Sequence, residues 1–351
     1  MSTRSRALPV ALAATLLVAA CGGGSSASPS QQATEPPASA EVTPGPTSAP
    51  VTLDLAHSYT DTQPQAACGA QVIKEEAEAA NVGLTIEIFG GSTLGGDTDR
   101  VAMVQAGDHD LDIQGASALS SVYEPMAVVD GAFVFDDSEH LYNFFTSDAS
   151  DGLKEGFLET GLRILGAWNT GARQFTANVP IRTPEDLQGL RMRFPGSPQF
   201  LMNARAMGIE PVVVAFEELY LALQQGTVDG QENPLVNIVS NNLDEVQDYV
   251  SLSSHQLSSN LVVINGDSWD GLSAEQQEAL SAAVETAMVE EPECVVEAEA
   301  EILAGWADAG SPQVIDDVDR EAFQVKAEAY LRENFTAEQV ELLEAIRSMA
   351  E

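Results

Sequence analysis

One long helical pattern near the C-terminal end constrains the fold more than any other feature of this chain. Ser273-Ala-Glu-Gln276 is a capping box, in which two side chains satisfy backbone N–H groups at a helix start. The pattern it opens reaches about Ala309, roughly 55 Å at 1.5 Å per residue. Only Pro292 interrupts it, where we expect a kink. A helix this long exceeds one small domain, and it predicts a body of two lobes that the helix bridges.

Strand and helix patterns alternate through the first half of the folded body. Val51 to Ala56 alternates apolar and polar residues, which is typical of a half-buried strand. Further strands are predicted at 83–89, 111–114 and 131–135, and helices at 65–80, 97–105, 140–145 and 153–160. Such alternation predicts an α/β body with a largely parallel sheet.

The second half shows clear helix starts and shorter strands. Thr183-Pro184-Glu185-Asp186 predicts a helix start, with Thr as N-cap and Pro in the first turn. Thr336 caps the last helix in the same manner as Ser273. A strand over 190–194 is expected to place Arg191 and Arg193 on one face, because they are two residues apart. A helix is predicted at 217–225, and strands at 246–252 and 261–265.

The N-terminal 50 residues carry targeting signals and no core. Arg4 and Arg6 precede an apolar run from Ala7 to Ala20, which is shorter than the ~20 residues that span a bilayer. Residues 1–20 therefore indicate a lipoprotein signal peptide, with Cys21 as the lipidated first residue; a short buried helix is the alternative. Residues 21–50 are rich in Gly, Ser, Ala, Pro and Thr and predict a disordered tether. We expect a body held at the outer face of a membrane.

The net charge and the cysteines narrow the possible partners. The chain has 54 acidic residues against 15 Lys and Arg, a formal charge of −39. This charge argues against nucleic acid as a partner, because its phosphates would be repelled.

Two cysteines, Cys68 and Cys294, remain after Cys21. An even pair in an exported protein predicts a disulfide, and two free buried thiols are the alternative. We expect a monomer.

Six of the 15 cationic residues fall in one stretch of this acidic chain. Only Glu185 and Asp186 oppose them there. Arg presents a planar fork that matches a carboxylate or a phosphate in two parallel hydrogen bonds. The cluster therefore indicates a site for an anion; surface arginines paired with neighbouring acids are the alternative. The six are Arg163, Arg173, Arg182, Arg191, Arg193 and Arg205.

The sequence shows no complete motif for binding a metal or a cofactor or for catalysis. Asp108-His-Asp110-Leu-Asp112 resembles the opening of a calcium loop, but Ile113 stands where such a loop needs Gly and Leu119 where it needs Glu. The four histidines have no zinc spacing. The sequence contains no Gly-x-Ser-x-Gly elbow and no phosphate-binding P-loop motif. We expect no metal, no cofactor and no enzymatic activity.

The segment from Glu218 to Leu235, which contains Gly226-Thr-Val-Asp-Gly-Gln-Glu-Asn233-Pro, strongly resembles the solute-binding proteins of tripartite ATP-independent periplasmic (TRAP) transporters. The resemblance extends over nearly the whole body, including Thr183-Pro-Glu-Asp-Leu-Gln-Gly-Leu-Arg-Met-Arg193. It implies a two-lobed, periplasmic-binding-protein-like α/β fold with chain crossovers between the lobes and the long helix bridging them. The expected lobes are 51–172 with 260–298, and 173–259 with 299–351.

The resemblance also implies a site for a small organic acid. Arg193 matches the arginine that contacts the substrate carboxylate, Asn233 an asparagine beside it, Arg173 a supporting arginine, and Phe216 an aromatic that packs on the ligand. The first lobe would contact the other end of the ligand. Looser matches there are Ser58, Asp97 and Ser117.

The residues themselves leave alternatives at this site. Arg193 lies in an apolar strand pattern, and a buried arginine needs an anionic partner, which a protein acid could equally supply. Asn233 precedes Pro234, which favours an extended backbone but also suits a turn. Phe194, Val179 and Gln63 depart from the family pattern and put the identity of the substrate in doubt.

Three functions are consistent with this sequence. The first is a lipid-anchored protein that delivers a carboxylate to a TRAP permease. The second is a sensor module that presents the ligand to a membrane receptor. The third is a secreted hydrolase. Neighbouring genes for a small and a large permease subunit would separate the first from the second.

Overall fold

The computed structural model describes residues 48–350. The predicted signal peptide, Cys21 and nearly all of the predicted tether lie outside these residues. Within them the strands are β1 (Val51–Ala56), β2 (Leu84–Phe89), β3 (Leu111–Gln114), β4 (Leu162–Ala177), β5 (Met192–Phe194), β6 (Val212–Val213), β7 (Gly230–Pro234), β8 (Tyr249–Asn265) and β9 (Gln313–Ile315). They form one sheet in the order β2-β1-β3-β8-β4-β7-β5-β6, with β9 beside β8.

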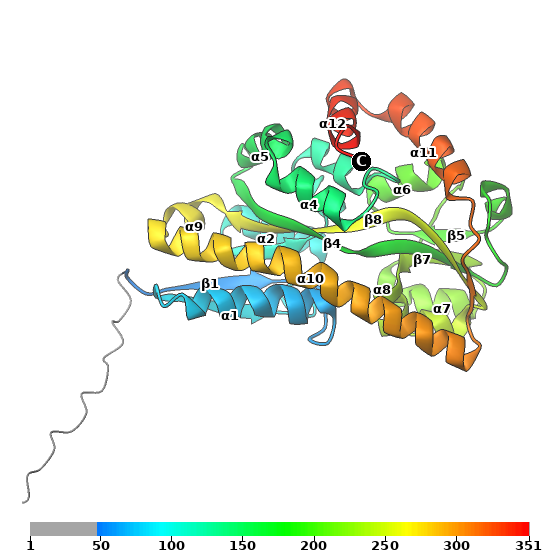
Figure 1. Cartoon of the computed structure of the whole chain (residues 1–351), viewed down its shortest axis with the longest axis horizontal. Helices are drawn as coiled ribbons and strands as arrows, with labels where there is room; N and C mark the ends of the chain where they lie inside the picture. Colours follow the sequence, from blue (N-terminus) through cyan, green and yellow to red (C-terminus); the bar gives the residue numbers. More distant parts are fainter. Residues whose placement is uncertain (1–47, 351) are drawn as a thin grey trace, which may run out of the picture. The chain divides into compact units, whose positions relative to one another are not determined.

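Helices connect the strands and cover the sheet (Figure 1). The longer ones are α1 (Gln71–Ala79), α2 (Asp97–Ala106), α4 (Ser138–Thr146), α5 (Asp151–Leu158), α6 (Pro198–Ala206), α10 (Ala274–Ala309), α11 (Arg320–Asn334) and α12 (Ala337–Arg347). The shorter ones are η1 (Gln65–Ala70), α3 (Ala116–Leu119), η2 (Glu124–Asp130), η3 (Asp148–Ser150), η4 (Pro184–Leu187), η5 (Phe216–Glu218), α7 (Leu219–Gln224), α8 (Leu235–Ser240), η6 (Leu243–Val246) and α9 (Gly266–Asp270).

Two long strands at the centre join the two halves of the sheet. β4 and β8 span 16 and 17 residues and pair antiparallel along most of their length. β3 pairs with residues 261–264 of β8, whereas β7 pairs with residues 173–177 of β4, so each half of the sheet attaches to a different part of this pair. Both strands are almost entirely buried, as expected for strands covered on both faces. The crossovers predicted between the lobes are these strands.

The long helix is confirmed as α10, which has 36 residues and begins with the capping box of Ser273 and Gln276. Figure 1 shows it running along the sheet, beside α1 at one end and near α8 and α7 at the other. Leu280 and Val284 join the apolar core of β1, β2 and β3. Trp306 joins a separate core of α7 and α8. One helix thus contributes to the cores of both halves.

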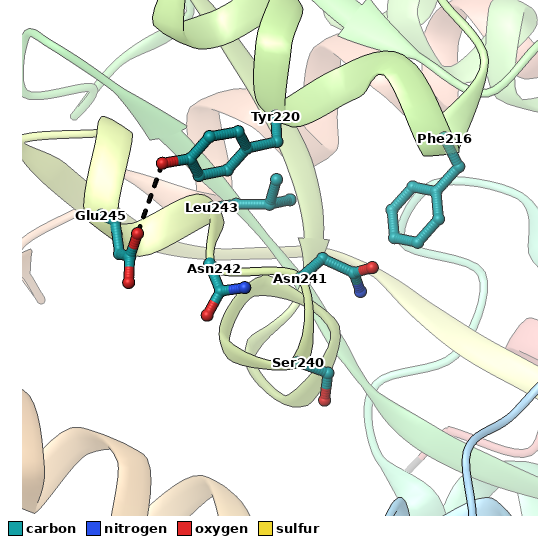
Figure 2. Close-up of a pocket in the computed structure, with 7 residues that line it drawn as sticks. All are labelled: Phe216, Tyr220, Ser240, Asn241, Asn242, Leu243 and Glu245. Carbon is teal, nitrogen blue, oxygen red and sulfur yellow. Dashed lines mark hydrogen bonds between the residues drawn. The ribbon is translucent and has the colours of Figure 1, made fainter. Parts of the chain in front are cut away.

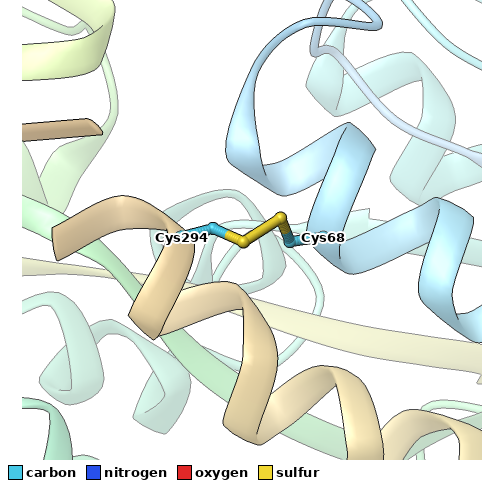
Figure 3. The surroundings of a disulfide bond; sticks show 2 residues. All are labelled: Cys68 and Cys294. Atoms are coloured by element: carbon cyan, nitrogen blue, oxygen red, sulfur yellow. A yellow bond between two sulfur atoms is a disulfide. The ribbon is translucent and has the colours of Figure 1, made fainter. Parts of the chain in front are cut away.

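A disulfide ties the first helical segment to this long helix. Cys68 of η1 and Cys294 of α10 are bonded, with their Cα atoms 6.5 Å apart and 226 residues between them in sequence (Figure 3). The predicted disulfide is therefore present in the structure, and the two cysteines are not free thiols.

The C-terminal helices pack on the opposite face from α10. α11 lies against α6, and α12 lies against η2. The His140 Nε2 atom of α4 is 2.8 Å from the carbonyl oxygen of Ile346 in α12. Residues predicted to belong to different lobes therefore share one apolar core here. The lobe boundaries remain a prediction.

Two expectations about the sheet are wrong, and a third is correct in part. Its centre is antiparallel, so the sheet is mixed and not largely parallel. The apolar run at 131–135 is not a strand but a buried turn with Phe133 at a φ of 57°, because apolarity alone cannot distinguish a strand from another buried segment. The strands predicted at 246–252 and 261–265 are one continuous strand, β8, which begins at Tyr249 and not at residue 246.

β4 was not predicted at all. Gly166, Asn169 and Gly171 interrupt its alternation, and the ladder with β8 shifts register at these positions. Glycine within a strand often marks such bulges.

Among the described residues, no helix has both the length and the apolarity needed to cross a membrane.

Candidate functional site

The arginine cluster seen in the sequence divides into surface and buried members. Arg182, Arg191 and Arg205 are exposed and pair with Asp317, Asp229 and Glu210. Arg163 lies over the Trp269 ring at 5.1 Å. Only Arg173 and Arg193 are buried, at 6% and 3% exposure. The alternative of surface arginines paired with acids therefore holds for three of the six. Arg191 lies outside β5 and does not share a buried face with Arg193.

Arg173 is held by a carboxylate from the neighbouring strand. Its Nε and Nη2 atoms donate to the two carboxylate oxygens of Glu232 on β7, with Nη2 at 2.8 Å from Oε1. Glu232 also contacts His255 of β8, whose Nε2 lies 3.2 Å from Oε2. Ser253 Oγ lies 2.8 Å from the other ring nitrogen of His255. Sequence reasoning did not single out Glu232, although it stands in the Glu-Asn-Pro motif.

The charges of this buried group follow from its contacts. Burial opposes ionisation of Glu232, but the Arg173 guanidinium and the hydrogen bond from His255 outweigh it, so the pKa of Glu232 lies below its ordinary value. Burial also lowers the pKa of His255, against the opposing effect of Glu232. A neutral His255 that donates through Nε2–H and accepts from Ser253 satisfies both contacts. The Arg173 charge is thereby matched within the protein.

Arg173 also orients Asn233, the next residue on β7. Its Nη2 atom donates to Asn233 Oδ1 at 3.0 Å. The amide oxygen therefore faces Arg173, and the amide nitrogen points the other way and donates to Gln231 Oε1. An amide nitrogen carries two hydrogens, so a second one remains for another acceptor. Asn233 is extended within β7, not a turn residue.

Arg193 occupies the strand on the far side of β7. β5 lies between β7 and β6, with Arg193 opposite Gln231 on one side and Val212 on the other. The Nε atom of Arg193 donates to the carbonyl oxygen of Val214 at 3.0 Å. Its guanidinium lies 5.7 Å from the centre of the Phe216 ring. The strands β4, β7 and β5 are neighbours in the sheet, so Arg173, Asn233 and Arg193 lie on three adjacent strands.

Phe216 also lines a surface hollow of about 430 Å³. Figure 2 shows Phe216 on one side of it and Tyr220 on another, with Tyr220 donating to Glu245. The remaining lining residues come from α8, η6 and the turn between them, and they were not predicted from the sequence. They are Ser240, Asn241, Asn242 and Leu243.

Ser58 and Asp97 form a pair at the other half of the sheet. Ser58 Oγ donates to Asp97 Oδ1 at 2.6 Å. Both accept hydrogen bonds from Nη2 of Arg100, each at 2.9 Å. Arg100 is fully buried and also binds Asp112. Arg100 is therefore what brings the predicted pair together, and sequence reasoning missed it because its partners lie 12 and 42 residues away.

Ser117 is connected to strand β8 through Asp130. The backbone N–H of Ser117 donates to Asp130 Oδ2 at 2.7 Å, and Ser259 Oγ donates to Asp130 Oδ1 at 2.7 Å. The residue before Ser259 on β8, Ser258, accepts from Nη1 of Arg173 at 3.3 Å. Ser117 and Arg173 are therefore connected to two neighbouring residues of β8, Ser259 and Ser258.

Contacts across the two halves also involve the loop after β1. Gln63, one of the departures from the family pattern, donates to Asn237 Oδ1 of α8 at 3.2 Å. Tyr59 of the same loop donates to Asn260 of β8 at 2.7 Å.

In residues 48–350, no group of three or more His, Cys, Asp or Glu side chains is arranged to hold a metal ion.

Comparison with known proteins identifies the family. The model of "Bacterial extracellular solute-binding protein, family 7" matches residues 55–338. The 2,3-diketo-L-gulonate-binding periplasmic protein YiaO of Escherichia coli is 33% identical over 267 residues, which cover 76% of this chain and 80% of that protein.

Solved structures agree with this match. A TRAP periplasmic solute-binding protein of Roseobacter denitrificans with bound L-galactonate has a TM-score of 0.76 and 29% identity, covering 86% of this chain and 100% of that one. A similar protein of Sulfurospirillum deleyianum with bound succinate has a TM-score of 0.76 and 26% identity, covering 86% and 99%. This chain therefore belongs to family 7 of the bacterial extracellular solute-binding proteins, the extracytoplasmic solute-binding components of TRAP transporters.

Proposed function

We propose that this protein captures a small organic carboxylate and delivers it to the membrane permease of a TRAP transporter. The observation that carries the proposal is the buried Arg193 guanidinium, which lies against Phe216 and one strand away from Asn233. A guanidinium offers two parallel N–H donors that fit a carboxylate. The relatives support this chemistry, because diketogulonate, galactonate and succinate are all carboxylates.

Each residue of the proposed site has a distinct role. Arg193 binds the carboxylate of the ligand, and Asn233 donates its second amide hydrogen to the same group. Arg173 does not need to contact the ligand, because its contact with Asn233 holds that amide in the required orientation. Phe216 packs on the ligand. The ligand would lie between the two lobes, with Ser58, Asp97 and Ser117 on the side opposite Arg193.

The proposal includes attachment to the outer face of the membrane. Lipidation of Cys21 would anchor the chain, and residues 22–50 would act as the tether. The protein would act as a monomer and catalyse no reaction. Metabolic labelling with a fatty acid tests the anchor, since Cys21→Ser should abolish the label.

Calorimetric titration of the purified protein with carboxylates tests the site. Arg193→Ala should lower affinity by roughly 2–5 kcal/mol, because it leaves a carboxylate without its charged partner in a buried site. This corresponds to about one and a half to four decades in Kd. Arg193→Lys should also bind poorly, since an ammonium cannot form two parallel hydrogen bonds.

Arg182→Ala is the matched control. Arg182 belongs to the same cluster in sequence, but it is exposed and pairs with Asp317 at 2.9 Å. Its removal changes the net charge by the same amount and should leave the affinity unchanged. Equal losses in Arg182→Ala and Arg193→Ala, both removed by moderate salt, would mean that the arginines act only through long-range attraction.

A further inference from the structure

Two carboxyl groups are buried where the long helix α10 crosses β4 (Figure 1). Glu291 is fully buried, and neither of its carboxyl oxygens has a hydrogen-bond partner among the described residues. One oxygen of Glu299, further along α10, is also buried without a partner there. An ionised carboxylate in such a place is costly, because it loses its hydration and finds no donor. Neither group belongs to the proposed ligand site.

Glycines bring the helix close to the sheet at both positions. A Cβ atom on Gly69 of η1 would lie 3.1 Å from the Trp168 ring of β4 and 3.7 Å from Glu291 Cγ, so these two side chains meet there. A Cβ atom on Gly171 of β4 would lie 2.7 Å from Glu299 Oε1. Both glutamates therefore point into the interface that α10 makes with β4 and η1.

No cation pairs with either carboxyl group in the described part of the chain. Burial is the one resolved cause of the rise in both pKa values, to about 7 for Glu299 and well above the ordinary 4.5 for Glu291. The packed elements η1, α8 and β9 contain no charged residue. The charged and titratable groups on the other packed segments are Lys74, Glu75, Glu76 and Glu78 of α1, Arg163 and Arg173 of β4, and Tyr59 of the loop after β1.

The cations on these segments are engaged elsewhere. Lys74 pairs with Glu78 on its own helix. Arg163 lies over the Trp269 ring, and Arg173 binds Glu232, as described above. The two glutamates therefore keep their burial cost uncompensated whenever they are ionised.

The crossing lies where both elements are least regular. The ladder of β4 with β8 shifts register three times between Ile164 and Phe175, and bulged strands bend at such points. Pro292 has no backbone N–H, so α10 lacks one internal hydrogen bond here. The disulfide of Cys294 ties α10 to η1 between the two glutamates (Figure 3). Beyond Cys294, α10 is held by non-covalent contacts such as that of Glu299 with β4.

We propose that Glu291 and Glu299 form a proton-sensitive latch between the long helix and the central strand. When they are protonated, α10 lies against β4 as described; when they are ionised, this contact loosens. The part of α10 beyond Cys294 responds most, because no covalent link holds it. Gly171 is two residues before Arg173, so the loosened stretch of β4 leads into the proposed ligand site. The latch is a property of the fold and does not depend on which ligand binds.

The direction of the effect follows from where the proton is held more tightly. In the loosened form an exposed glutamate has its ordinary pKa of 4.5, whereas Glu299 against β4 has a pKa of about 7. The loosened form therefore gains population as pH rises from 4.5 to about 7. Each pH unit in this range changes the opening equilibrium about tenfold, so Glu299 alone contributes about thirtyfold from about pH 5.5 upward.

Hydrogen exchange of the purified protein, followed by mass spectrometry and corrected for the intrinsic pH dependence of exchange, tests the latch. In the wild type, the protection of residues 168–172 and 295–303 should fall by about thirtyfold or more between about pH 5.5 and about pH 8.5. Glu291→Gln and Glu299→Gln should each reduce this loss, and the double variant should abolish it, because Gln has nearly the same shape and cannot ionise.

Glu297→Gln is the matched control, since Glu297 is exposed on the same helix. It should lose protection with pH as the wild type does. Helix α12, which packs on η2, is the internal reference and should keep its protection. Wild-type protection that does not change with pH, or an undiminished loss in the two single variants, would overturn the latch. An equal loss of protection in α12 would also overturn it, because the whole acidic protein would then be loosening.

Discussion

Replacing Glu299 with Gln should stabilise the protein near neutral pH and leave its stability unchanged in mild acid. Glu299 lies on α10 and its Oε1 atom packs against Gly171 of β4, 2.7 Å from where a Cβ would stand. That oxygen is buried and has no hydrogen-bond partner among the described residues. Burial raises the pKa of Glu299 from 4.5 to about 7.

The sign and size of the effect follow from this pKa. The folded protein holds the proton more tightly than the unfolded chain, so the free energy of unfolding falls as pH rises from 4.5 to about 7. At 1.36 kcal/mol per unit, the loss reaches about 3 kcal/mol at a pH above both values. Gln has the same shape and no charge to bury. Glu299→Gln should therefore recover up to about 3 kcal/mol near pH 8 and almost nothing near pH 4.

Urea unfolding followed by circular dichroism, repeated across this pH range, measures the difference between variant and wild type. The protein carries a net charge of −39, so removal of any acid relieves some repulsion. Glu297→Gln is the matched control, because Glu297 is exposed on the same helix. Equal gains in both variants, or a gain for Glu299→Gln that persists in mild acid, would refute the reasoning.

Two further predictions concern the whole body. Replacing Cys68 and Cys294 with Ser should lower the free energy of unfolding by about 5 kcal/mol in the chain-entropy description of a cross-link, since 226 residues separate the two; chemical denaturation measures this, and a loss below about 1 kcal/mol would contradict it. A tightly bound carboxylate ligand should draw the two lobes together and reduce the radius of gyration in small-angle scattering, whereas an unchanged radius would count against closure.

Sequence reasoning located the features that depend on neighbouring residues. The capping boxes of Ser273 and Thr336 are present, and β1 and β3 have the predicted bounds. These features succeed because a cap or an alternating pattern acts within a few residues. Sequence reasoning did not predict β4, because its bulges break the alternation of apolar and polar residues. Such a strand is held in place by its neighbours in the sheet.

At the candidate site, too, the sequence indicated single residues but not the contacts between distant ones. The family pattern pointed to Arg193, Asn233 and Arg173, and the structure brings these three onto adjacent strands. It could not indicate that Glu232 matches the charge of Arg173, because these residues are 59 positions apart. Nor could it indicate that Arg100 joins Ser58 to Asp97. The roles predicted for these residues in ligand binding remain to be tested.

The sequence by itself determined the α/β class, the long bridging helix and the family, because these depend on local periodicity, caps and a contiguous motif. Only the tertiary structure decided which arginines are buried and which acids they bind. The physical reason is that charge pairing and burial depend on strand register between distant segments. Six arginines close in sequence therefore reach very different surroundings, with Arg182 at the surface and Arg193 in the interior.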